Sequence, residues 1–332
     1  MKSNLDLIRE VDLFPYEDHE PEAHQRIMSN IYTLLWEDDR GSYPIGYVLT
    51  RVHDQLLALD PAIRGPMTSD SEARTMTLFK EGGFDERTAR AAAVADHFRR
   101  NDTFKILRKW RNELWPVYGR NGELLFSMER CALGLLGAVR YGVHMSAYVR
   151  DDSVPFGIKL WIARRSLTKE TFPGMLDNTA AGGLMTGEDP FECIIREADE
   201  EASLPEDVVR NHAENPGTVT YIYITNEAQV GEAGFIYPEC QWIYDLELPL
   251  DVIPKPKDGE AEGFYLKTVD EVKEDLRQGR FKDNCALVAL NFLERRGMLQ
   301  EEGEKELEEM RRRMNRVMPF PGPHQQGWRR QA

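Results

Sequence analysis

The chain has 332 residues, which is enough to bury a substantial core, and we expect two domains. Acidic residues (57) outnumber basic ones (42), and the formal net charge of −15 argues against nucleic acid or an anionic membrane as the main partner. No apolar stretch is long enough to span a bilayer, and segment 1–20 differs from a targeting signal, so we expect a soluble cytoplasmic protein. The four cysteines lack paired spacing, so we expect reduced thiols.

The first part of the chain, residues 1–130, mixes short helical and extended patterns and is predicted to form a smaller α+β domain. An alanine-rich segment from Asp85 to about Arg100 predicts a helix within it. The dipeptide Asn121-Gly122 is typical of a tight turn between two antiparallel strands.

Strand patterns dominate from about Gly142. Residues 143–148 and 157–163 are the first two predicted strands, and Ile158, Leu160 and Ile162 alternate with other side chains in the second. Alternation of this kind predicts strands with one side facing a core.

A glycine-containing loop and an acidic helix come next. Asp189 is a natural N-cap, Pro190 then falls at the first helical position, and Glu192 completes the spacing of a capping box. Apolar residues recur at helical spacing and predict a buried stripe, formed by Phe191, Ile194, Ile195 and Ala198.

Three glutamates of this helix, Glu197, Glu200 and Glu201, share one face because positions i, i+3 and i+4 are neighbours on a helix. Their charges repel, so a bound cation would stabilise the cluster, and carboxylate oxygens suit Mg²⁺ or Mn²⁺. The alternative is a solvated acidic face. The loop 182–187, with three glycines that let the backbone approach a phosphate or metal, favours the cation site.

Loop and helix together resemble the signature of the Nudix hydrolase superfamily. The positions that match it, in order, are Gly182, Glu188, Arg196, Glu197, Ala198, Glu200, Glu201 and Leu204. Ser203 stands where the signature has glycine, a departure that concerns the turn after the helix and leaves the candidate ligands unchanged.

Further motifs resemble one branch of that superfamily, the thiamine-pyrophosphokinase-related proteins with an extra N-terminal domain. The motifs are Lys169 and the segments 110–113, 129–130, 141–144, 161–166, 173–178, 244–249 and 258–260. The resemblance covers about residues 46–297. It implies hydrolysis of thiamine diphosphate, or of its oxidised and damaged forms, to the monophosphate.

After the acidic helix, strands are predicted over 218–224, 234–248 and 263–269, and helices over 269–277 and 286–294. Strands with a helix on each side indicate a mixed sheet in an α/β/α sandwich, which is also the fold that the Nudix resemblance implies. We assign residues 131–300 to this domain and 301–332 to a charged helix and a frayed tail.

Cleavage of a diphosphate requires neutralised phosphoryl charge and a water in line with the scissile bond. Glu197 and Glu201 are the first candidates for Mg²⁺ ligands, with Glu200 completing the set or orienting the water; the resemblance adds the carbonyl of Gly182. An ion pair from Arg196 to Glu200 would aim the carboxylates. Glu188 is either an outer partner of this set or a loop charge.

The general base in this superfamily is often a helix glutamate or a carboxylate from a distant loop. Segment 249–263 is predicted to be such a loop, and Glu260 is the first candidate among its acidic residues. Arg164 and Lys169 follow the second strand and are candidates for binding the substrate phosphates. Arg165 faces the opposite way from Arg164 because adjacent strand residues alternate.

A thiamine pocket requires aromatic faces for a cationic thiazolium and a flat pyrimidine. Trp110 and Tyr148 are candidate walls, as are Trp115 and Tyr118, although each of these aromatics also fits a hydrophobic core. His144 is predicted to be a hydrogen-bonded structural residue.

Three functions stay open at this point: hydrolysis of thiamine diphosphate-type compounds, hydrolysis of another diphosphate such as ADP-ribose or a nucleotide sugar, and a non-catalytic binding module. All three imply a small-molecule diphosphate partner. An oligomer is compatible with each.

Overall fold

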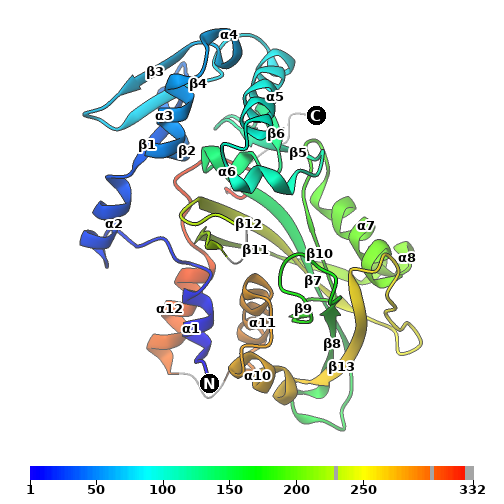
Figure 1. Cartoon of the computed structure of the whole chain (residues 1–332). Coiled ribbons are helices and arrows are strands. Elements are labelled where there is room, and N and C mark those ends of the chain that lie inside the picture. The colour runs from blue at the N-terminus through cyan, green and yellow to red at the C-terminus, as the bar shows by residue number, and fades with distance from the viewer. Residues whose placement is uncertain (228–230, 300–302, 326–332) are drawn as a thin grey trace.

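The structure is a computed structural model that describes residues 1–227, 231–299 and 303–325, and it divides into two sheet-based parts (Figure 1). The N-terminal part has a four-stranded sheet of order β2-β1-β4-β3 and a separate β5–β6 hairpin. Its strands are β1 (Ile31–Asp38), β2 (Gly41–Leu49), β3 (Met67–Asp70), β4 (Thr75–Leu78), β5 (Leu114–Tyr118) and β6 (Leu124–Glu129). Its helices are α2 (Pro21–Met28), α3 (Thr50–Ala58), α4 (Pro61–Arg64), α5 (Phe84–Arg100) and α6 (Leu133–Leu136).

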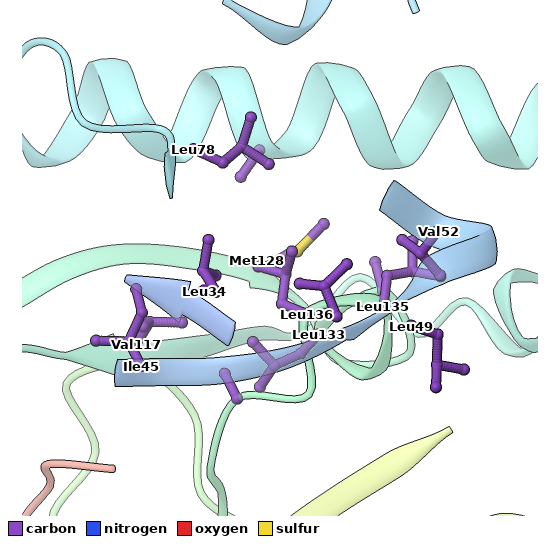
Figure 2. Packing of buried hydrophobic residues seen from close by; sticks show 14 of the residues in the cluster. Leu34, Ile45, Leu49, Val52, Leu78, Val117, Met128, Leu133, Leu135 and Leu136 are labelled. Atoms are coloured by element: carbon purple, nitrogen blue, oxygen red, sulfur yellow. The ribbon is translucent and has the colours of Figure 1, made fainter. Parts of the chain in front are cut away.

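The core of this part lies between the sheet, the hairpin and helices α5 and α6. Leu34 of β1, Val117 of β5, Met128 of β6 and Leu133 of α6 come together there (Figure 2). The helix predicted from the alanine-rich segment is confirmed as α5, and the Asn-Gly turn joins the antiparallel strands β5 and β6 as expected.

Truncating Leu34 to alanine is expected to lower the free energy of unfolding by about 3 kcal/mol, because a fully buried leucine leaves a cavity. Thermal and chemical denaturation followed by circular dichroism would measure this. Leu57→Ala is the matched control, since Leu57 is 56% exposed. Equal losses in the two variants would contradict the assignment of Leu34 to the core.

The second part is built on a seven-stranded mixed sheet. Five strands follow the order β11-β12-β7-β8-β13, and the short strands β10 and β9 pair with β7 and β8. Strand β12 runs parallel to β7, whereas the other pairs are antiparallel. Short strand β10 lies beside the first half of β7, where β8 does not reach. The strands are β7 (Arg140–Arg150), β8 (Ile158–Arg165), β9 (Leu176–Asp177), β10 (Ala180–Gly183), β11 (Ala213–Ile224), β12 (Ile236–Glu247) and β13 (Ala261–Thr268).

Helices cover both faces of this sheet, so the predicted α/β/α sandwich is confirmed (Figure 1). Helices α7 (Pro190–Ala202) and α8 (Glu206–His212) cover one face, and α10 (Val269–Arg277) and α11 (Asp283–Arg295) the other. The alternation of β7 divides its side chains between the two cores. Val143 and Met145 pack in the cluster with α7, whereas Tyr148 packs with α11.

Both ends of the chain pack against the second part. Leu7 and Ile8 of α1 (Asn4–Arg9) and Met314 of α12 (Glu304–Met314) are buried in one cluster with α11. Residues 1–12 therefore lie with the second core, although we assigned them to the N-terminal domain. The tail also differs from the expected frayed segment, because Phe320 is 1% exposed and contacts Tyr47 across the domains. Residues 326–332 lie outside the described part.

Within the described ranges, no helix combines the length and the hydrophobicity needed to cross a bilayer. The four cysteines are all buried and free, as the spacing predicts.

Candidate active site

Helix α7 begins and ends at residues whose local chemistry fixes its position. The side chain of Asp189 accepts hydrogen bonds from the backbone N–H groups of Phe191 and Glu192, which confirms the predicted N-cap. The Glu192 carboxylate pairs with Arg210 of α8. At the other end, Ser203 takes the left-handed conformation (φ 54°, ψ 30°) that glycine adopts more easily, so the turn is kept despite the departure from the signature.

Helix α7 presents two of its glutamates to strand β10. The Glu201 carboxylate accepts a hydrogen bond of 2.9 Å from the backbone N–H of Ala181. The Glu197 carboxylate fills the space in front of Gly182, where any Cβ atom would overlap it. Glu200 points outward and its side chain is 49% exposed. The carboxylates of Glu197 and Glu201 thus lie beside the backbone of the glycine-rich strand.

Arg196 links three acidic side chains of the loop and the helix. Its Nη1 donates to Glu197 (2.8 Å) and to Glu200 (2.9 Å), and its Nε donates to Glu188 (2.9 Å). The expected ion pair from Arg196 to Glu200 is therefore present, and Glu188 joins it from the loop before the helix. A guanidinium held by three carboxylates is a rigid support for them.

Burial makes the charged form of the two inner glutamates costly. It raises the pKa of Glu197 to about 7, although Arg196 opposes the shift. Burial also raises the pKa of Glu201 well above its ordinary value, and the negative charges of Asp177 and Glu197 add to the shift. A divalent cation would offset both effects, so these hard oxygen donors fit Mg²⁺ or Mn²⁺. In the part of the chain described, no three His, Cys, Asp or Glu side chains are already arranged around a common metal position.

Glu260 meets this cluster from the loop before β13. It lines one small cavity together with Glu201, Asp177 and Arg165. Although burial opposes it, an ion pair with Lys169 (2.5 Å) lowers the pKa of Glu260. Its backbone carbonyl also accepts from the N–H of Ser166 (2.8 Å), so the loop is fixed to the end of β8.

A larger cavity of about 290 Å³ adjoins β10. Ala181, Gly182 and Gly183 form part of its wall, and both domains contribute to the rest. Its charged lining residues are Arg130, Arg140, Lys282, Glu239 and Asp283, and its aromatic ones are Trp115, Tyr141, Phe172, Tyr221, Tyr223 and Tyr237. A concave wall of aromatic rings with polar and charged groups among them is typical of a small-molecule site.

Trp115, named among the candidate walls, lines this cavity, whereas three of the predicted substrate residues lie elsewhere. Trp110 donates to Asn112 and stacks on Arg99. Tyr148 lies on the face of β7 that α11 covers, and it packs in the core on that face. Arg164 pairs with Glu262 (3.4 Å) beside a different surface pocket.

The fourth, Lys169, is paired with Glu260 as described above. His144 has its Nδ1 2.8 Å from the Asn178 Oδ1, and burial lowers its pKa to about 4, as expected of a structural histidine.

Sequence reasoning missed Arg140, Glu239 and Gln241 as cavity residues. The available signal was alternation, because Arg140, Gly142 and His144 share one face of β7. Nothing in the sequence showed that β12 would bring Glu239 beside them, since that pairing joins segments a hundred residues apart.

Two family models match the chain. One, described as a domain of unknown function (DUF4743), matches residues 44–140, and the other, described as the NUDIX domain, matches residues 140–285.

Three relatives extend this likeness. A Saccharomyces cerevisiae protein named Uncharacterized protein YJR142W is 34% identical over 96% of this chain and 92% of its own length. Nudix hydrolase 20, chloroplastic, and Nudix hydrolase 24, chloroplastic, both from Arabidopsis thaliana, are 38% and 36% identical over 68% and 70% of this chain. The chain spans 58% and 61% of the lengths of these two plant proteins.

Proposed function

The chain belongs to the Nudix superfamily and is a Nudix-type hydrolase, and we propose that its substrate is thiamine diphosphate or an oxidised analogue, cleaved to the monophosphate. The observation that carries the proposal is the cavity of about 290 Å³ beside the glycine-rich strand. Its volume lies at the lower end of the range for small-molecule sites, which suits a compact two-ring group.

One acidic group in the cavity wall also suits thiamine. Glu239 is held in place by hydrogen bonds from the Tyr221 hydroxyl (2.7 Å) and from Gln241 (3.1 Å). A fixed carboxylate among tyrosine rings favours a cationic heteroaromatic group. The resemblance of segments 110–113, 173–178 and 244–249 to the thiamine-pyrophosphokinase-related branch supports the same substrate.

We assign the chemistry to the residues around β10. Glu197, Glu201 and the Gly182 carbonyl would hold Mg²⁺ or Mn²⁺, with Glu200 as a further ligand or a group that orients water. When bound, the ion supplies positive charge to the phosphoryl oxygens. Arg196 keeps the glutamates in register through its three ion pairs.

Glu260 is the proposed general base. The ion pair with Lys169 keeps it ionised, so that it can accept a proton from the attacking water. Its position next to Glu201 in one cavity puts it within reach of water bound at the same place.

The direct test is hydrolysis of a panel of diphosphates in the presence of Mg²⁺, measured as phosphate release or, for ADP-ribose, as formation of AMP. The panel contains thiamine diphosphate, its oxidised analogues, ADP-ribose and nucleoside diphosphates. We expect release from the thiamine compounds. Hydrolysis confined to ADP-ribose and the nucleotides would overturn the thiamine assignment, and no hydrolysis of any compound would favour a binding module.

Mg²⁺ is expected to stabilise the protein before any substrate is added. At a concentration one hundred times its Kd, a ligand that binds only the folded state adds about 2.7 kcal/mol to the free energy of unfolding. Thermal melts with Mg²⁺ and with a chelator would measure the difference. Identical melts over a wide range of Mg²⁺ concentration would contradict the metal site.

A further inference from the structure

We infer that the N-terminal domain completes the active site by holding Arg130 and Arg140 as a clamp for the terminal phosphate of the substrate. The inference rests on the proposed diphosphate hydrolysis and adds a subsite to it. Both arginines line the large cavity, together with Gly182 and Gly183 of the strand that adjoins the glutamates.

Trp115 of β5 holds the two arginines in place. The guanidinium carbons of Arg130 and Arg140 lie 5.0 Å and 4.9 Å from the centroid of its ring. The indole is 5% exposed, so it serves as a support for the arginines and not as a stacking surface for a ligand. Its edge also fills the space in front of Gly183, where a Cβ atom would overlap it.

Hydrogen bonds fix the β5–β6 hairpin to the loop between β10 and α7. The backbone N–H of Thr186 donates to the carbonyl of Leu114 (2.9 Å). The Thr186 hydroxyl lies 2.7 Å from the hydroxyl of Ser127 on β6. The glycine-rich loop is therefore tied to the hairpin that ends beside Arg130.

The arginines retain hydrogen-bonding capacity for an anion. The Nε of Arg140 is buried and has no hydrogen-bond partner in the described part of the chain, and Glu239 is 3.9 Å from it, so this N–H reaches an anion only when the side chain shifts toward the cavity. The ion pair of Arg130 with Glu113 (3.1 Å) uses its Nη1, and the Arg130 side chain is 38% exposed. Buried charged donors of this kind are normally satisfied, and paired guanidinium groups match phosphate oxygens.

The test is calorimetric titration of the full chain with methylenediphosphonate, a diphosphate that cannot be hydrolysed, in the presence of Mg²⁺. Arg130→Gln is expected to weaken binding at least tenfold, since a charge-assisted hydrogen bond is lost. Arg130→Lys should recover part of it. Arg108→Gln is the matched control, because Arg108 lies on the same domain and pairs with Asp102 away from the cavity.

Wild-type affinity in Arg130→Gln, or an equal loss in Arg108→Gln, would overturn the inference. Melting temperatures verify folding, and Arg130→Lys decides the question if the glutamine variant does not fold. A failure of the proposed function gives a different result. In that case the wild-type chain would bind methylenediphosphonate and Arg130→Gln would bind it less tightly, but no compound of the panel would be hydrolysed.

Discussion

Replacing Glu201 by glutamine is expected to reduce the rate of diphosphate hydrolysis by about three orders of magnitude, because charge stabilisation by a bound ion contributes several kcal/mol to the transition state. The Glu201 carboxylate is the one that receives the backbone N–H of Ala181, so the amide can keep that hydrogen bond while losing the charge. Phosphate release under saturating substrate and Mg²⁺ would measure the effect.

The same variant is expected to be at least as stable as the wild-type chain in the absence of metal. Burial and the charges of Asp177 and Glu197 raise the pKa of Glu201, so its ionised form costs free energy in the fold. The matched control is Glu192→Gln, which removes an exposed carboxylate from the same helix. Near-wild-type turnover in Glu201→Gln would exclude Glu201 as a ligand, and a large fall in its melting temperature would indicate a structural role.

A single methyl group at Gly182 is expected to lower activity about a hundredfold, the loss typical of a displacement of about 1 Å in an active site. The Cβ atom of an alanine there would overlap the Glu197 carboxylate and push it away from β10. Some loss of stability is also expected, since the overlap extends to the Glu197 Cγ and the carboxylate is held by Arg196. Steady-state kinetics and thermal melts of Gly182→Ala would test both statements.

Gly83→Ala serves as its control. Gly83 precedes α5, its φ of −82° suits alanine, and no atom lies within 4 Å of the added Cβ. Unchanged kinetics in Gly182→Ala would mean that the position of Glu197 beside Gly182 is irrelevant to catalysis. Loss of the fold would mean that the added methyl group displaces strand β10 and not the Glu197 carboxylate.

The acidic helix and its surroundings were predictable because their signals are local. Asp189, Pro190 and the apolar stripe each act within a few residues, and the structure contains the helix they predict. The ion pair from Arg196 to Glu200 is equally local. Even Ser203, which departs from the signature, keeps the backbone conformation that the pattern requires.

The walls of the cavity could not be predicted in this way, since they depend on which strands become neighbours. Tyr148 and Gly142 lie on the same face of β7, yet one packs against α11 and the other lines the cavity. The sequence around each of the two residues has the same strand pattern, so it does not predict which of them lines the cavity. Their other neighbours distinguish them, because β10 lies beside Gly142 whereas β8 lies beside Tyr148, and the β5–β6 hairpin contributes to the cavity wall.

The packing of both chain ends on α11 has a consequence for the architecture of the molecule. Asp12, with a fully buried side chain, bonds to Arg316 (2.7 Å) and to the backbone N–H of Ile222 (3.2 Å), so the two ends and β11 meet at one point. In topological terms the N-terminal domain is an insertion, because α1 packs in the core of the second part and the chain returns to that core only after β6. A fragment that starts at residue 131 would expose the apolar surface of α11 that Leu7 and Ile8 cover. Gene fusions and truncations that treat the two domains as separable modules would therefore damage the one that carries the glutamates.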